Sequence, residues 1–256
     1  MPFVTVAADT IYYDRGGSNE GPALVLIHGS GGDHSHWPPE LRNLGDARVF
    51  APDLPGHGRS EGRGRDSVED YADVIEAFVS ELGLEDVVPA GHSLGGAVVQ
   101  TLALRSPAWL SRIILVGSGA RLRVHPAILE GLQTDPEATL RRVCEWSFGP
   151  EASESMVAGA YEKFLSTDSA IIHGDYTACD RFDIMDRVGK ITHPALVMVG
   201  TADQMTPVKY GEYLHQRLSR SRLAVIESGG HMMALEKPGA LVRCISDFLN
   251  SGDTTK

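Results

Sequence analysis

Cysteine is scarce in this 256-residue chain, which contains only Cys144, Cys179 and Cys244. The three lie far apart and form no C-x-x-C pair, so the sequence disfavours both a disulfide framework and a zinc site. None is followed by a motif that would activate a thiol, and we interpret all three as small core or surface residues. This use of cysteine is typical of a reducing compartment, and we expect a cytoplasmic protein.

Long apolar runs and excess positive charge are also missing. No stretch approaches the roughly 20 apolar residues that a membrane-spanning helix requires. Residues 1–6 carry neither a basic leader nor a long apolar run, so we expect no signal peptide. The formal net charge is −11, which disfavours nucleic acid and anionic membrane surfaces as partners. The net charge of the whole chain does not indicate which substrate would bind. For the oligomeric state, we expect either a monomer or a homodimer.

The apolar residues that are present fall into short segments of strand length. Because a strand buried on both faces of a parallel sheet reads as a continuous apolar run, Ala23–Ile27 is a strong example. Helical patterns separate most of these segments, among them one that begins at Ser67 with Asp70 three residues later, a weak capping box. We expect strands at Phe3–Val6, Thr10–Asp14, Ala23–Ile27, Arg48–Ala51, Asp86–Ala90, Arg112–Val116, Ala195–Val199 and Leu223–Ile226.

The alternation of strands and helices stops from about Arg121 to about Lys190 and then resumes. This alternation predicts an α/β fold: a doubly wound, mostly parallel sheet with a helical cap inserted after the sixth strand. The core is then residues 1–120 and 191–256, and the cap residues 121–190. Within the cap we expect helices near Pro126–Leu132, Pro136–Trp146, Ala152–Leu165, Ser169–Asp180 and Phe182–Val188, and in the core one near Trp37–Leu44.

A G-x-S-x-G pattern, Gly91 to Gly95, joins a predicted strand to a predicted helix and places Ser93 on a sharp turn. Glycine on either side lets the backbone bend tightly and approach its neighbours. The turn exposes the serine oxygen next to the unpaired N–H groups of a helix N-terminus. Because a neutral serine is a poor nucleophile, the chemistry also needs a base and a carboxylate that orients it.

His231 is the best placed of ten histidines, because it directly follows the last predicted strand in a glycine-rich loop. Asp203 follows the preceding strand and is the best placed acid. We interpret His28 and His57 as braces of backbone, and Asp53 as a cap for nearby N–H groups. Other acids flank His231, notably Glu236, and we expect them at helix ends or exposed. The candidate set therefore occurs in the chain order Ser, Asp, His.

Five motifs in this order resemble the α/β-hydrolase fold superfamily over nearly the full chain. They are His28-Gly29, the run Asp53 to Ser60, the elbow Gly91 to Gly96, Gly200 to Pro207, and Gly230-His231 through Pro238. The chain is most similar to small cytoplasmic members with a helical cap, of the esterase-like and C–C-bond-hydrolase-like kinds. Serine at the nucleophile position disfavours the haloalkane-dehalogenase and epoxide-hydrolase branches, which use aspartate there.

The resemblance implies that Ser93 attacks a carbonyl carbon, that His231 takes its proton and that Asp203 holds the histidine tautomer. It implies an oxyanion hole made of the backbone N–H groups of Leu94 and Ser30, with Gly31 as the alternative to Ser30. Backbone donors tolerate any side chain, so the sequence leaves that choice open. No metal and no organic cofactor is implied.

These features predict a hydrolase that cleaves a small carboxylic ester through an acyl-serine intermediate. Thioester, lactone and C–C bond cleavage use the same serine geometry and remain open, as do a ligand receptor and a cofactor-free perhydrolase. C–C hydrolases of this superfamily act on acidic substrates and tend to place an arginine in the pocket, so Arg121, Arg123 and Arg181 are of interest. Besides the small-molecule acyl substrate no partner is predicted, and the candidates for substrate contact are Gly31, Trp146 and Met232.

Overall fold

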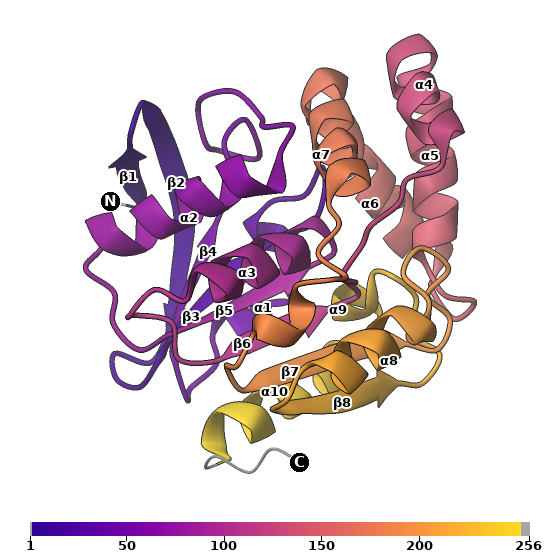
Figure 1. The fold of residues 1–256 in the computed structure, drawn as a ribbon. Coiled ribbons are helices and arrows are strands. Elements are labelled where there is room, and N and C mark those ends of the chain that lie inside the picture. Colours follow the sequence, from indigo (N-terminus) through magenta and orange to yellow (C-terminus); the bar gives the residue numbers. More distant parts are fainter. Residues whose placement is uncertain (1, 252–256) are drawn as a thin grey trace.

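The computed structural model describes residues 2–251, which contain one sheet of eight strands in the order β1-β2-β4-β3-β5-β6-β7-β8 (Figure 1). Strand β2 runs antiparallel to both β1 and β4, and all other neighbours are parallel. The doubly wound, mostly parallel sheet is therefore confirmed. The strands are β1 (Phe3–Val6), β2 (Asp9–Gly17), β3 (Ala23–Ile27), β4 (Arg48–Pro52), β5 (Val87–His92), β6 (Ile113–Val116), β7 (Ala195–Gly200) and β8 (Ser221–Ile226).

Helices cover both faces of this sheet, because alternate residues of each central strand point to opposite sides. In β3, Val25 belongs to the core cluster that also contains residues of α2 (Val68–Glu81), α3 (Leu94–Arg105) and α8 (Val208–Arg217). These three helices cover the nearer face of the sheet in Figure 1. Leu24 and Leu26 pack on the other face, with α1 (Pro39–Arg42), α9 (Met233–Glu236) and α10 (Pro238–Asn250). No helix within residues 2–251 is both long enough and apolar enough to cross a membrane.

Four further helices lie between β6 and β7 in the chain and stand together at one side of the sheet (Figure 1). They are α4 (Pro126–Thr134), α5 (Pro136–Ser147), α6 (Glu154–Leu165) and α7 (Ser169–Arg181), and we call them the cap. The chain entering the cap and the chain leaving it pair at one bridge, Arg121 with Asp183.

Two expected helices differ from the structure. The helix expected at Phe182–Val188 is wrong, because the N–H of Ile184 and the carbonyl of Phe182 bond across to the chain that enters the cap. Only a 3-10 turn, η2 (Val188–Lys190), follows. The helix expected near Trp37–Leu44 is shortened to α1, since Pro38 and Pro39 fix where it begins and Asn43 ends it. A 3-10 turn, η1 (His34–His36), precedes it.

Glycine allows close packing where β5 meets α3. A Cβ added to Gly91 would lie 2.1 Å from the carbonyl oxygen of Gly95, and one added to Gly95 would lie 2.2 Å from that of Ile27. Backbone atoms of neighbouring elements therefore occupy the space that a side chain would need. This contact sets the position of α3, and with it the turn at residue 93.

We predict that Gly95→Ala lowers the free energy of unfolding by roughly 3 kcal/mol, the upper end of the usual cost of overpacking, since a methyl group would overlap the backbone of β3. Urea unfolding followed by circular dichroism measures the change. Gly45→Ala is the matched control, because an added Cβ there meets no atom within 4 Å. Its effect should stay within about 0.5 kcal/mol. Equal effects of the two substitutions would contradict this account.

Candidate active site

Ser93 lies between β5 and α3 in a strained conformation, with φ 52° and ψ −113°. A non-glycine residue with positive φ is held there only by its surroundings. The N–H of Ser93 donates to the carbonyl of Val116 at 3.0 Å, and its own carbonyl accepts from the hydroxyl of Ser118 at 2.9 Å. Together with the glycine contacts, these bonds hold the turn and leave the side chain partly exposed.

His231 and Asp203 follow β8 and β7 and meet at the same edge of the sheet. Nδ1 of His231 lies 2.9 Å from Oδ2 of Asp203, which also accepts from the Thr206 hydroxyl at 2.7 Å. Burial favours the neutral carboxylic acid, but His231 and the Thr206 donors outweigh it and lower the pKa of Asp203. Since an ionised carboxylate only accepts hydrogen bonds, Nδ1 carries a hydrogen, and in the neutral imidazole the lone pair is then on Nε2.

Ser93 and His231 line one cavity of about 280 Å³ between core and cap. Among the described residues no hydrogen bond joins the side chains of Ser93 and His231. The distance between a catalytic serine and its base is often too long for a hydrogen bond until substrate binds. Gly31 and Met232, both predicted to contact substrate, line the same cavity, as does Ser30. The fold therefore brings five residues that were predicted from the sequence together around one cavity.

Trp146 is not brought to this cavity. The residue is 40% exposed, and it does not line the cavity next to Ser93. The buried face of α5 includes Leu140, Val143 and Ser147. Of these, Ser147 lines the cavity. Since neighbouring residues on a helix point about 100° apart, Trp146 faces outward when Ser147 faces inward.

Some of the backbone N–H groups near Ser93 already donate a hydrogen bond within the protein, and others do not. The N–H of Gly31 donates to Oδ2 of Asp175 at 2.8 Å, so it is already occupied. Within residues 2–251, no hydrogen bond involves the N–H of Ser30. Leu94 is the first residue of α3, and an N–H at that position has no partner in its own helix. Ser30 and Leu94 therefore keep donors that Gly31 does not offer.

His92 contributes to the site in a way that its position beside Ser93 did not suggest. Its ring packs 4.5 Å from the rings of both His36 and His231, measured between centroids. Its Nε2 donates to the carbonyl of His231 at 2.8 Å. Burial, followed by the repulsion of His231 and His36, lowers the pKa of His92 well below its ordinary value. A neutral His92 therefore holds the backbone of the loop that carries His231.

Glu236 lies at a helix end, as expected, since it is the last residue of α9. It is also partly buried and links the cap to the loop that carries His231. Its Oε2 accepts from the N–H of Gly149 at 2.8 Å and from that of Gly230 at 3.2 Å. Gly149 follows α5, and Gly230 precedes His231. The sequence contained no signal for this contact, because the two glycines lie far apart in the chain.

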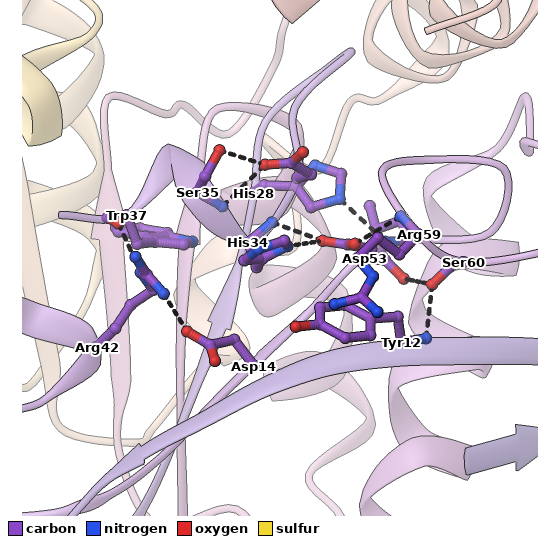
Figure 2. Close-up of polar contacts among 12 residues, drawn as sticks. Tyr12, Asp14, His28, His34, Ser35, Trp37, Arg42, Asp53, Arg59 and Ser60 are labelled. Atoms are coloured by element: carbon purple, nitrogen blue, oxygen red, sulfur yellow. Dashed lines mark hydrogen bonds and ion pairs between the residues drawn. The ribbon is translucent and has the colours of Figure 1, made fainter. Parts of the chain in front are cut away.

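Asp53 braces loops, as predicted, and Figure 2 shows its contacts. It is fully buried, and its carboxylate accepts from the N–H of His34 at 2.6 Å, from Nδ1 of His34 at 2.8 Å and from the N–H of Arg59 at 2.9 Å. His28 also braces backbone, since its Nε2 accepts from the N–H of Leu54 at 3.0 Å. Both interpretations from the sequence are confirmed.

Asp53 and His34 also form, with Asp33, a group whose potential metal-ligand atoms lie within 4.8 Å of one another. These atoms already have partners. Asp53 binds His34, as described above, while Asp33 pairs with Lys163 and accepts from the N–H and hydroxyl of Ser35. We therefore interpret the group as an internal hydrogen-bond network.

A further buried carboxylate, Asp175 on α7, faces the core. Oδ2 of Asp175 lies 2.9 Å from Nε2 of His57, and its Oδ1 accepts from the hydroxyl of Tyr71 at 2.5 Å. Nδ1 of His57 donates to the carbonyl of Pro55 at 3.1 Å. Burial disfavours the charged imidazole, but the Asp175 carboxylate outweighs it and raises the pKa of His57. His57 thus braces backbone, as expected, and also pairs with the cap.

Comparison with known proteins defines the family. The model of the alpha/beta hydrolase family matches residues 24–243. This match spans the elbow, the loops that carry Asp203 and His231, and the whole cap. The chain therefore belongs to the alpha/beta hydrolase family, and the resemblance inferred from its motifs is confirmed.

Individual relatives cover nearly the whole chain. A solved structure of a thermophilic esterase is 35% identical, covers 96% of each chain and has a TM-score of 0.85. The enol-lactonase from Burkholderia xenovorans LB400 has a TM-score of 0.90 at 24% identity, over 98% of this chain and 100% of the other, and shares the fold. A 2-hydroxy-6-oxo-6-phenylhexa-2,4-dienoate hydrolase of Comamonas testosteroni is 27% identical, over 93% of this chain and 91% of its own.

We predict that His57 makes the stability of the protein depend on pH. Because its pKa is raised above the ordinary 6.5, its contribution is complete below about 6.5 and is lost as pH rises through the folded-state pKa. Urea unfolding of the wild type and of His57→Gln between pH 6 and 9 measures this. The difference in free energy of unfolding should shrink as pH rises, and a constant difference would contradict the assignment.

Proposed function

We propose that this member of the family is a serine hydrolase that cleaves small, uncharged carboxylic esters through an acyl-serine intermediate. The observation that carries the proposal is the hydrogen bond between His231 and Asp203, which orients an imidazole at the cavity that Ser93 also lines. A serine, a base with a free Nε2 and an orienting carboxylate are the groups that acyl transfer requires.

In the proposed reaction, Oγ of Ser93 attacks the ester carbonyl carbon while Nε2 of His231 takes the hydroxyl proton. The carbonyl oxygen becomes negatively charged and accepts hydrogen bonds from the N–H groups of Ser30 and Leu94. The intermediate then collapses, and His231 returns the proton to the leaving alkoxide. Water attacks the acyl-serine with His231 as base, which releases the acid and regenerates Ser93. No metal or organic cofactor enters these steps.

The charge of the cavity lining supports an uncharged acyl group. Lys163 supplies the one cation among the residues that line the described cavity, and it is paired with the buried carboxylate of Asp33. Burial raises the pKa of Asp33, but Lys163 and Ser35 outweigh it and lower that pKa to about 2. Asp33 therefore stays ionised at neutral pH and neutralises Lys163. An anionic substrate would meet no unpaired positive charge there.

The three cap arginines considered from the sequence also support this view. Arg121 pairs with Asp183, Arg123 with Asp180 and Arg181 with Asp66. All three are on the exposed surface, and none lines the cavity. The dienoate named for the Comamonas testosteroni relative carries a carboxylate, for which this cavity offers no free arginine. The 35% identical thermophilic esterase is consistent with ester hydrolysis.

We predict that Ser93→Ala lowers kcat for p-nitrophenyl butanoate by roughly 10⁴-fold or more, because the acyl-serine can no longer form. The release of p-nitrophenol measures the rate. A phosphonate should label the wild type at residue 93, as mass spectrometry of the peptides would show. Ser80→Ala, at an exposed position on α2, is the control and should keep wild-type kcat. Unchanged activity in Ser93→Ala would reject the nucleophile.

We predict that the wild type prefers p-nitrophenyl 4-methylpentanoate over the p-nitrophenyl monoester of succinic acid, which has the same shape but a terminal carboxylate. Asp33→Asn keeps the acceptor for Ser35 and frees Lys163. The kcat/KM of the anionic ester relative to the neutral one should then rise by roughly fivefold, the effect of about 1 kcal/mol from a partly exposed ion pair.

The double variant Asp33→Asn/Lys163→Met is the control for this second prediction. It removes the freed cation, so the ratio should return to the wild-type value or below it. A wild type that favours the anionic ester would overturn the proposed substrate class while leaving the serine chemistry intact.

A further inference from the structure

Helix α7 and the residue pair before it hold the loop Gly29–Gly32, which we call the oxyanion loop because it contains Ser30. Asp175 accepts from the N–H of Gly31 at 2.8 Å. Thr167 donates its hydroxyl to the carbonyl of Gly31 at 3.5 Å, and the hydroxyl of Ser30 lies 3.7 Å from Sγ of Cys179. Three side chains of the cap therefore fix two successive residues of a core loop.

Asp175 is the strongest of these contacts. Its side chain is completely buried, and a buried carboxylate is stable only when its oxygens are hydrogen-bonded and its charge is compensated. The N–H of Gly31 is one of three donors that do this, with His57 and Tyr71. Because leaving Asp175 unpaired would be costly, the carboxylate strongly favours the loop conformation that presents the Gly31 N–H to it.

The backbone of Gly31 is adapted to this arrangement. Its φ is +66°, and a Cβ added there would lie 2.7 Å from the ring of Phe164 on α6. The loop therefore adopts a conformation that favours glycine and packs directly under the cap. With the Gly31 N–H directed to Asp175, the neighbouring N–H of Ser30 is left as the donor for a substrate oxygen.

We propose that Asp175 is a positioning residue for the oxyanion hole: it holds the N–H of Gly31 and thereby aligns the N–H of Ser30 for the developing negative charge. This inference rests on the proposed acyl-transfer function. Asp175 does not touch the reacting atoms and acts through the loop. Because Asp175 belongs to the cap and Ser30 to the core, the oxyanion hole is complete only when α7 is docked.

The test compares Asp175→Asn with Arg181→Gln. Asparagine has the same shape but one oxygen fewer to accept hydrogen bonds, so the bond to Gly31 is weakened. Arg181 lies on the same helix and also ties it to the core, through an exposed ion pair with Asp66 at 2.8 Å. Arg181→Gln therefore removes a link between cap and core and leaves the oxyanion loop intact.

For Asp175→Asn we expect kcat for p-nitrophenyl butanoate to fall at least about tenfold, less than the 10²–10³ that complete loss of a donor costs. KM should change little, since the loop acts on the transition state. Affinity for a trifluoromethyl ketone, whose adduct with Ser93 carries an oxyanion, should fall in proportion to kcat. Arg181→Gln should keep both values within about twofold of the wild type.

Several outcomes would overturn the proposal. A lower melting temperature with unchanged kcat and ketone affinity would make Asp175 merely structural. Equal losses in Asp175→Asn and Arg181→Gln would assign the effect to cap docking in general. The fraction of protein that a phosphonate has labelled at the end of the reaction gives the number of reactive Ser93 side chains and does not depend on the rate. A wild type that is not labelled at Ser93 would therefore reject the proposed function itself.

If Asp175→Asn does not fold, Thr167→Val provides the decision, because it removes the donor to the carbonyl of Gly31 and keeps the side-chain shape. We expect a two- to threefold loss of kcat at an unchanged melting temperature, as for a weak hydrogen bond. An unchanged kcat in that variant would then overturn the proposal.

Discussion

The close approach of α3 to strands β3 and β5 is the constraint on which the candidate site depends. Gly91 and Gly95 leave no space for a Cβ between these elements, and the chain can therefore turn within one residue. That turn forces Ser93 to a positive φ. The cost of the strained conformation is offset by the packing of the buried helix behind it, which is apolar along most of its length.

Two buried carboxylates then organise the space around Ser93. Asp203 is surrounded by donors from Thr206, Met205 and His231, and this keeps it ionised and fixes the imidazole. Asp175 is surrounded by donors from three core segments and ties the cap to them. Since a buried charge without partners is expensive, both carboxylates select one arrangement of the loops that bind them. Core and cap are thus joined by polar contacts as well as by apolar packing.

Physical regularities that act locally made much of the fold and of the candidate site predictable from the sequence. Continuous apolar runs identified the buried strands, and the residues that follow parallel strands meet at one edge of the sheet. Ser93, Asp203 and His231 were found in this way, because each lies in the turn or loop that follows a strand. The expected helix at Phe182–Val188 was wrong because two of its backbone groups bond to Leu122 and Ala120, sixty or more positions earlier in the chain. No local pattern encodes such a bond.

The fold class, the position of the cap in the chain and the three side chains that lie together at the sheet edge could be predicted from the sequence, since periodicity and glycine spacing act over a few residues. How the side chains of the cap face the site depends on tertiary packing. In the folded protein, Trp146 faces solvent and Asp175 faces the core, where it accepts a hydrogen bond from the N–H of Gly31. These choices depend on how whole helices dock, which is the sum of many contacts between residues that are distant in sequence.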